Sequence, residues 1–409
     1  MAKFPSLTDA VLLWALVLCS VQAAFAELDN AGELDAYLER QIDATIIPGA
    51  VALVVDADDV LYEGAFGVRN AAAGEAMTSD TIFRIASMTK PVAATVIMML
   101  VDEGKLDLDD PIARYVPAFA ERQVIEVFDA ATGSYTTRPA ASAATIRHLL
   151  SHSSGLAYPF ASDVVSSISA SDDAPDGDVF PLLYDPGTAW SYAGGIAIVG
   201  RVAESIEGVG LDTLMRERLF VPLGMEDTSF IVRAEALDRV ATIHRLVDDG
   251  TLVEAENPAD VRSAVSGDGG LNSTAADYAR FVQFFLNDAV APDGTRLLSR
   301  AAVREMTRSQ LGVRTVTLQD EPTPLLARAF PLGAGRDGFG LGFQVTGEHD
   351  SATVRAPGSL SWAGIFNTEF WIDPARGVGG VLLMQYLPFY DPAAIETLQG
   401  FEALVYRGL

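Results

Sequence analysis

The chain has 409 residues, with 28 Lys and Arg against 55 Asp and Glu, a formal net charge of -27 at pH 7 and 49% hydrophobic residues. This hydrophobic content is too high for a disordered acidic chain, and it suffices for one large domain or two closely packed subdomains. The acidic excess argues against nucleic acid and against docking on an anionic membrane, because few basic residues could neutralise phosphates. The single cysteine, Cys19, excludes a disulfide framework within the chain and a cysteine-based zinc site.

The N-terminal residues have the pattern of a secretory signal peptide. Lys3 precedes an apolar run from Val11 to Val21, and Ala24-Phe25-Ala26 forms a small-residue cleavage site before Glu27. The run is shorter than the ~20 residues that a membrane-spanning helix needs. We therefore expect residues 1–26 to be a signal peptide and the mature protein to be periplasmic or secreted, without membrane insertion. An N-terminal core helix is the alternative.

Hydrophobic spacing and turn residues predict strands near both ends of the remaining chain. A helix is expected over Ala31–Ile47, followed by a hairpin of two β-branched runs, Val51–Val55 and Val60–Val68. Toward the C-terminus, several strands precede a closing helix over Pro392–Tyr406. These predicted strands are Phe339–Val345, Ala352–Arg355, Phe366–Ile372 and Gly379–Tyr386.

The middle of the chain predicts mainly helices. Their expected ranges are Lys90–Glu103, Thr145–Ser151, Gly194–Gly208 and Ser273–Asn287. A small hairpin is expected over Gln123–Thr137. The polar stretch Ser162–Pro186, rich in Asp and Pro, predicts a long surface loop.

This order of elements predicts an α/β fold of the α+β type. A mostly antiparallel β-sheet would be built from both chain ends and flanked by helices, beside a central, mainly helical subdomain. We expect the sheet subdomain to comprise about residues 27–95 and 300–409, and the helical subdomain about residues 96–299. The cleft between the two is the default location for a site.

Several common catalytic patterns are missing from the sequence. There is no G-x-S-x-G, which weakens an α/β-hydrolase interpretation, and there is no H-E-x-x-H. His148 and His152 are four residues apart, but no third ligand stands nearby, so we interpret them as structural. We expect no metal and no cofactor. A Ser-His-Asp triad has no local signature to support it.

A serine and a lysine at helical spacing form the strongest candidate site. Ser87-Met88-Thr89-Lys90 is an S-x-x-K sequence in a chain that otherwise prefers Arg to Lys. An apolar helix follows, so Ser87 would begin it and Lys90 would lie one turn later on the same face. An ammonium beside a hydroxyl can hold or transfer a proton, and a helix N-terminus favours a developing oxyanion. In the alternative interpretation, Ser87 only caps the helix and Lys90 is a surface residue.

These residues resemble a known superfamily. The segment Thr81–Ala94 (TIFRIASMTKPVAA) is similar to the nucleophile segment of the serine β-lactamases and penicillin-binding proteins. Leu149–Leu156 resembles the family's LLxHxSGL stretch, and Pro186–Tyr192 resembles its PGxxxxY segment, which carries the catalytic tyrosine. Lesser landmarks follow in the same order, at Pro222–Met225, Gly267–Leu271, Gly340–Phe343 and Trp362–Gly364. The resemblance covers about residues 30–405 and implies a β-lactamase/transpeptidase-like fold.

The departures from the family pattern indicate a subclass. Where a β-lactamase would have Lys-Thr-Gly or His-x-Gly, this chain has Trp362-Ala363-Gly364. Where class C enzymes have Tyr-x-Asn, it has Tyr192-Ala193-Gly194. Tryptophan in the first position of that strand is typical of family VIII carboxylesterases and related acyl transferases.

The resemblance implies a role for each matching residue. Ser87 would attack the substrate carbonyl, and Tyr192 would act as general base with Lys90 beside it. Backbone N–H groups of Ser87 and of Ile365, just after Gly364, would hold the oxyanion.

The same resemblance suggests what the site accepts. Trp362 would provide an apolar wall for acyl groups, and Tyr158 would add to the pocket. We therefore expect a serine hydrolase that cleaves small carboxylic esters, or a related acyl transferase. A β-lactamase or D-Ala peptidase acting on an amide, and a non-catalytic relic, are the alternatives. The sequence predicts no oligomeric state.

Overall fold

The protein is described from a computed structural model. The structure describes residues 28–44, 47–171, 174–175, 180–247, 249–255, 261, 263–349 and 354–409. The predicted signal peptide lies outside these residues. Within them, no helix combines the length and the apolar character needed to cross a membrane.

An eight-stranded sheet joins the two ends of the chain, as predicted. Its strand order is β10-β11-β12-β13-β14-β1-β2-β3, and every neighbouring pair is antiparallel. In the middle, β1 pairs with β14 in a register that sets Val51 opposite Leu383. The strands are β1 Gly49–Val55, β2 Val60–Asn70, β3 Glu75–Ala76, β10 Gly338–Phe339, β11 Gln344–Val345, β12 Leu360–Gly364, β13 Thr368–Asp373 and β14 Val378–Leu383.

Helices cover both faces of this sheet, which explains why β1 is buried at every position. Its side chains alternate between two hydrophobic cores. One face packs against the first and last helices, α1 (Ala31–Ala44) and α10 (Pro392–Gly408). The opposite face packs against α2 (Thr89–Asp102) and α8 (Ala275–Leu286). Covering by the terminal helices was expected from the sequence, whereas α8 was expected in the helical subdomain beside the sheet.

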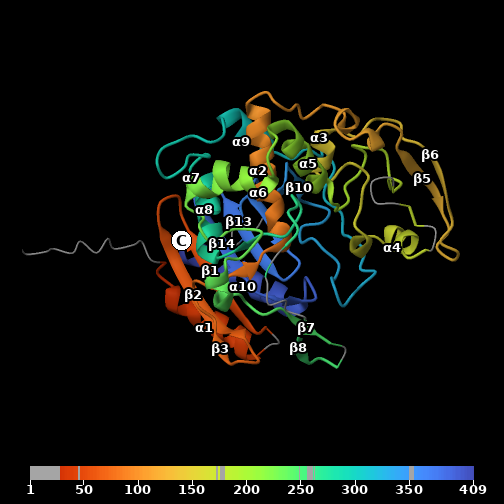
Figure 1. The fold of residues 1–409 in the computed structure, drawn as a ribbon. Coiled ribbons are helices and arrows are strands. Elements are labelled where there is room, and N and C mark those ends of the chain that lie inside the picture. Colours follow the sequence, from red (N-terminus) through yellow and green to blue (C-terminus); the bar gives the residue numbers. More distant parts are fainter. Residues whose placement is uncertain are drawn as a thin grey trace, which may run out of the picture.

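The middle of the chain surrounds α2 with further helices (Figure 1). Because α2 is apolar on all sides, it is buried from Thr89 to Leu100 and contacts α5, α6 and α9. The helices of this region are α3 Ile146–Leu150, α4 Asp163–Ser169, α5 Gly195–Glu207, α6 Leu211–Met215, α7 Val221–Leu223 and α9 Arg300–Thr307. The predicted hairpin is present as β5 (Gln123–Phe128) and β6 (Tyr135–Pro139), at the side of the molecule away from β2 (Figure 1).

Short strands complete the connections around the sheet. The strand β4 (Phe83–Arg84), just before Ser87, pairs with β9 (Asn272–Ser273). The strand β7 (His244–Leu246) lies between β8 (Leu252–Glu254) and β15 (Tyr386–Leu387).

Four sequence predictions need correction or fall outside the described residues. Phe339–Val345 is not one strand, because a turn with Gly342 at φ +93° folds it back into β10 and β11. The strand predicted over Gly379–Tyr386 ends at Leu383, and Tyr386 starts the separate strand β15. The predicted loop Ser162–Pro186 contains α4, which Ser162 caps by accepting a hydrogen bond from Val165 N. Half of the predicted strand Ala352–Arg355, residues 352–353, lies outside the described residues, and Val354 and Arg355 are not in a strand.

Candidate active site

Ser87 lies in a one-turn helix, η1 (Ala86–Met88), that leads directly into α2. Ala86 has φ +44°, a sparsely populated value for a residue with a side chain, so the turn is held by its surroundings. Two contacts hold it: Ile85 N donates to Leu271 O at 3.0 Å, and Tyr278 OH donates to Met88 O at 3.0 Å. The serine is therefore presented on a rigid element, with its side chain only partly buried.

Lys90 is the centre of the site. It follows Ser87 by one turn, as predicted, and it is only 1% exposed. Its Nζ donates to Ser87 Oγ at 3.3 Å and to the backbone oxygen of Asp268 at 2.6 Å. The surface-lysine interpretation is therefore wrong, because burial and two hydrogen bonds fix the ammonium beside the serine hydroxyl.

Tyr192 lies on the other side of Lys90. The Lys90 Nζ is 4.7 Å from the centroid of the Tyr192 ring, within cation–π range. Tyr192 is 3% exposed, and its backbone N–H donates to Gln319 Oε1 at 3.0 Å. Its hydroxyl makes no hydrogen bond to any part of the chain that the structure describes. The structure thus brings Ser87, Lys90 and Tyr192 together, with the phenol free to meet a substrate.

An aspartate that was not predicted as a site residue completes the environment of Lys90. Asp268 accepts hydrogen bonds through its carboxylate from the hydroxyls of Ser266 and Tyr158. Burial opposes ionisation of Asp268, but Lys90 and these hydrogen bonds outweigh it and lower the pKa of Asp268 below its usual range. Only its place in the landmark Gly267–Leu271 marked it in the sequence, and an Asp among glycines ordinarily indicates a turn.

Tyr158 therefore has a different position from a simple pocket wall. Its hydroxyl is bound to Asp268, and its ring centroid lies 5.2 Å from Lys90 Nζ and 5.0 Å from the Tyr192 ring. Burial and the nearby Tyr192 and Asp268 raise the pKa of Tyr158 well above its usual range. It stays a neutral phenol that lines the site and holds Asp268 in place.

Trp362, predicted as an apolar wall for acyl groups, lies beside Tyr192. The two ring centroids are 5.0 Å apart, and Trp362 is 6% exposed. Phe330 packs edge-on against the same tyrosine at 5.6 Å. On this side Tyr192 is thus bordered by aromatic rings, and strand β12 carries no cation to replace the lysine of the lactamase pattern.

The end of β12 lies directly against the segment that carries Ser87. A Cβ at Gly364 would come within 2.3 Å of Ile85 O, so only glycine fits this approach. Thr368 Oγ1 donates to the same Ile85 oxygen at 3.4 Å. Ile365, which follows Gly364, packs against the core on this side. The two predicted oxyanion donors, the N–H groups of Ser87 and Ile365, therefore belong to adjoining segments.

The two histidines of the predicted structural pair have packing roles. His148 Nδ1 accepts from Thr145 N at 3.2 Å at the start of α3. His152 is 1% exposed and lies among aromatic rings, with its own ring stacked on Trp362. Burial and the nearby Lys90 hold the pKa of His152 well below its usual range. Across the described residues, no group of three or more His, Cys, Asp or Glu could hold a metal ion.

Comparison with known proteins places this site in context. A family model described as Beta-lactamase matches residues 34–404. The chain is 38% identical to Protein Rv1367c of Mycobacterium tuberculosis, over 90% of this chain and 93% of that protein. It is 30% identical to Esterase EstB of Burkholderia gladioli, over 86% of this chain and 90% of that protein. Among solved structures, a simvastatin synthase (LovD) mutant from Aspergillus terreus matches with a TM-score of 0.78 and 26% identity, covering 92% of this chain and 96% of that chain.

Proposed function

The chain belongs to the beta-lactamase family, and from that premise we propose that it cleaves small carboxylic esters through an acyl-enzyme on Ser87. The observation that carries the proposal is the buried Lys90 ammonium, 3.3 Å from Ser87 Oγ and enclosed by Tyr192. This arrangement supports nucleophilic catalysis by a serine whose developing negative charge has a cation beside it. The similarity to Esterase EstB supports ester cleavage.

The proposed reaction has two steps. In the first, Tyr192 takes the Ser87 proton while Ser87 Oγ attacks the ester carbonyl, and the alcohol then leaves with that proton. In the second, Tyr192 takes a proton from water, the hydroxide attacks the acyl-enzyme, and Ser87 recovers its proton as the acid departs. Tyr192 accepts each proton as a phenolate, and the Lys90 ammonium stabilises that negative charge electrostatically, because its Nζ faces the Tyr192 ring. The backbone N–H groups of Ser87 and Ile365 stabilise the oxyanion in both steps.

The surroundings of the site support esters over β-lactams. A β-lactam carries a carboxylate and an amide side chain, and the lactamase pattern provides a strand cation and an Asn for them. Here Trp362 and Gly194 occupy those places, and a Cβ at Gly194 would lie 3.1 Å from the carboxylate of Asp268. A neutral ester needs neither anchor, whereas the lactam carboxylate would find the apolar Trp362 in place of a cation, and the lactam amide would find no Asn.

The test compares one neutral ester with one lactam on the same enzyme. We expect kcat/KM for a chromogenic cephalosporin to be at least ~30-fold below that for p-nitrophenyl butyrate, the weak end of the ~2–4 kcal/mol expected for a lost charged contact and a lost hydrogen bond. Equal or higher efficiency on the cephalosporin would instead establish amide hydrolysis as the function.

A covalent label tests the nucleophile separately. A fluorophosphonate should label Ser87, and Ser87→Ala should abolish both labelling and turnover. Ser134→Ala, which changes an exposed serine on the β5–β6 turn, serves as the matched control and should leave both unchanged. An adduct on any other serine would refute the mechanism.

Acyl transfer is the second candidate, and the structural similarity to simvastatin synthase (LovD) favours it. In this reaction an alcohol replaces water in the second step, and the same residues act. Adding a primary alcohol to the p-nitrophenyl butyrate assay distinguishes the two functions. An acyl transferase would form the new butyrate ester at the expense of free butyrate, whereas a hydrolase would release butyrate at an unchanged rate.

We further propose that residues 1–26 direct export and are then removed. The expected product is a periplasmic or secreted protein that starts at Glu27. N-terminal sequencing of the protein after expression in a bacterial host with the full leader tests this. A cytoplasmic product that still begins at Met1 would contradict it.

A further inference from the structure

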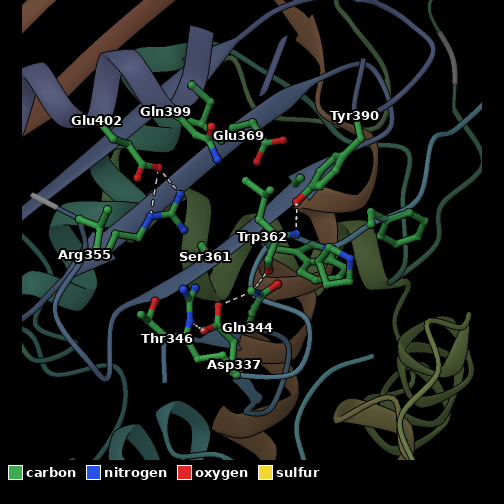
Figure 2. A pocket seen from close by; sticks show the side chains of 18 of the residues that line it. Asp337, Gln344, Thr346, Arg355, Ser361, Trp362, Glu369, Tyr390, Gln399 and Glu402 are labelled. Carbon is green, nitrogen blue, oxygen red and sulfur yellow. Dashed lines mark hydrogen bonds and ion pairs between the residues drawn. The ribbon is translucent and has the colours of Figure 1, made fainter. Parts of the chain in front are cut away.

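A cavity lies against Trp362, the residue that also packs beside Tyr192 (Figure 2). Its volume is about 220 Å³, which at ~30 Å³ per water would hold roughly seven waters or one small molecule. Residues of β12, β13 and α10 line it, together with the segments Phe330–Asp337 and Phe389–Tyr390. None of Ser87, Lys90 and Tyr192 lines this cavity, so it is a separate compartment that shares the Trp362 and Phe330 walls with the catalytic centre.

The cavity contains one carboxyl group that the described residues leave unpaired. Glu369 on β13 is 6% exposed, and its Oε1 makes no hydrogen bond within the described part of the chain. Figure 2 shows this carboxyl between Gln399 and Tyr390, without a dashed line to either. A buried carboxyl with an unmet oxygen is costly, so the group is available to a ligand that supplies the missing partner.

The other charged groups on the cavity wall are already neutralised in pairs. Arg355 donates to Glu402 on α10, with Nε 3.1 Å from Oε1, and Arg336 donates to Asp337 at 2.6 Å. His349 Nε2 bonds the backbone oxygen of Arg355. Among the described residues of the cavity wall, Glu369 is then the acid without a basic partner. Ionised Glu369 therefore leaves one uncompensated negative charge beside the Arg355–Glu402 and Arg336–Asp337 pairs.

From this geometry we propose that the cavity binds a small organic ammonium ion, with Glu369 as its counter-ion. The positive group would pair with the Glu369 carboxylate, and the apolar remainder would contact the aromatic walls of Trp362, Phe330 and Tyr390. An anion is disfavoured, because Glu369, Glu402 and Asp337 all face the cavity and the chain carries a net charge of -27. A neutral ligand would leave Glu369 protonated and forgo the stronger, charge-assisted hydrogen bond.

Ammonium binding is coupled to proton release. Burial raises the pKa of Glu369 well above its usual range; the nearby Arg355 opposes this, and Glu402 adds to it. Without a bound cation Glu369 is therefore a neutral acid, and a bound cation lowers that pKa and expels the proton. Affinity for the cation should consequently rise with pH until Glu369 is ionised without the ligand.

The direct test is calorimetric titration of the full-length mature protein with benzylammonium. Benzyl alcohol and benzoate, which have a similar shape but zero and negative charge, serve as ligand controls. We expect benzylammonium to bind at least ~10-fold more tightly than benzyl alcohol, the scale of one charge-assisted hydrogen bond. Between about pH 6 and 8, where an alkyl amine keeps its charge, the affinity should increase, and the binding heat should depend on the ionisation enthalpy of the buffer.

Two variants complete the experiment. Glu369→Gln keeps the shape of the side chain but removes its charge, so it should lose the preference for benzylammonium. Glu396→Gln makes the same charge change on α10 outside the cavity lining, and it should bind like the wild type. If Glu369→Gln does not fold, the alcohol comparison and the proton release on the wild type still decide the matter. Equal affinity for benzylammonium and benzyl alcohol would overturn the proposal, as would binding without proton release.

The ammonium could belong to a free amine or to an ester substrate, and inhibition kinetics separate these sources. A substrate-borne amine predicts competitive inhibition of p-nitrophenyl butyrate hydrolysis by benzylammonium. If the ligand is a free amine, benzylammonium should change kcat for p-nitrophenyl butyrate without competing with that substrate. Binding itself, measured as above, does not depend on the proposed esterase activity, so either proposal can fail alone.

Discussion

At the scale of single residues, Lys90 connects every part of the candidate site. Its ammonium has three N–H donors, and the structure assigns two of them, to Ser87 Oγ and to Asp268 O. The rings of Tyr158 and Tyr192 enclose the remaining approach. A cation held in this way can stabilise negative charge on either hydroxyl without moving.

This arrangement predicts that Lys90 and Tyr192 act as one unit. Lys90→Ala and Tyr192→Phe should each lower kcat on p-nitrophenyl butyrate by at least ~10²-fold, the usual scale for losing a general base. The double variant should be little worse than either single variant. Tyr135→Phe, on an exposed tyrosine of β6, is the matched control and should retain activity. Strictly additive losses would show that the two side chains act independently.

A second residue-scale prediction concerns the stability contribution of Asp268. Its folded-state pKa is lowered, so its ionised form stabilises the protein above the ordinary carboxyl range, and that stability disappears as the pH falls through the lowered pKa. Asp268→Asn should therefore reduce the free energy of unfolding by about 1–3 kcal/mol near pH 7, the cost of unpairing buried partners. Urea unfolding at several pH values should show the gap closing in acid. A gap that widened in acid would contradict the assignment.

Replacing His152 gives a third test at this scale. Its ring is buried among Trp190, Tyr192, Phe339 and Trp362, and its low pKa keeps it neutral. We expect His152→Phe to lower the melting temperature and to leave kcat nearly unchanged. An inactive variant with an unchanged melting temperature would point to a histidine-based mechanism.

Sequence reasoning found the residues of this site that belong to local patterns, and it missed those that do not. Ser87 and Lys90 share one helical turn, so their spacing alone predicted that they would meet. Asp268 and Gln319 reach Lys90 and Tyr192 from distant loops, and no spacing rule relates such positions. Tyr158 was expected to contact substrate, but the partner that fixes its hydroxyl could be identified only from the fold.

At the scale of secondary-structure elements, the contact between β12 and η1 determines the shape of the proposed oxyanion site. Gly364 allows the end of the strand to approach Ile85 O closely. Gly364→Ala should push the two segments apart, reduce kcat at least ~10-fold and destabilise the fold by about 1–3 kcal/mol, as for other overpacked positions. Gly32→Ala, in α1 with open space around its Cα, is the control and should be neutral or slightly stabilising. Full activity in Gly364→Ala would exclude this strand from the oxyanion site.

Long elements were predicted well, and short ones were not. The helices α2, α5 and α8 and the strands β1 and β2 carry enough periodic residues to be identified from the sequence. The pair β10 and β11 has two residues per strand, and only the left-handed turn at Gly342 separates them. A helix of seven residues, α4, was masked by its polar composition and by the Asp- and Pro-rich segment after it.

At the scale of the whole molecule, the charge of -27 should affect which substrates reach the site. Anionic substrates are repelled at long range. At 0.1 M salt this repulsion is largely screened between charges more than about 10 Å apart. Raising the salt concentration should therefore increase kcat/KM for the anionic cephalosporin while leaving that for p-nitrophenyl butyrate almost unchanged. A parallel response of both substrates would show that the net charge has no such role.

The central place of β1 in the sheet has a consequence for how the protein is made. Its partner β14 is near the other end of the chain, and Asn30 donates to Leu404 O across 374 positions. The N-terminal strands β1 and β2 therefore leave the ribosome long before β14 and α10 are synthesised. Until then, the edge of β1 that pairs with β14 is unpaired. Such distant pairings also slow folding. We expect the sheet to close only after synthesis is complete, so that the chain depends on chaperones for longer than its final stability would indicate.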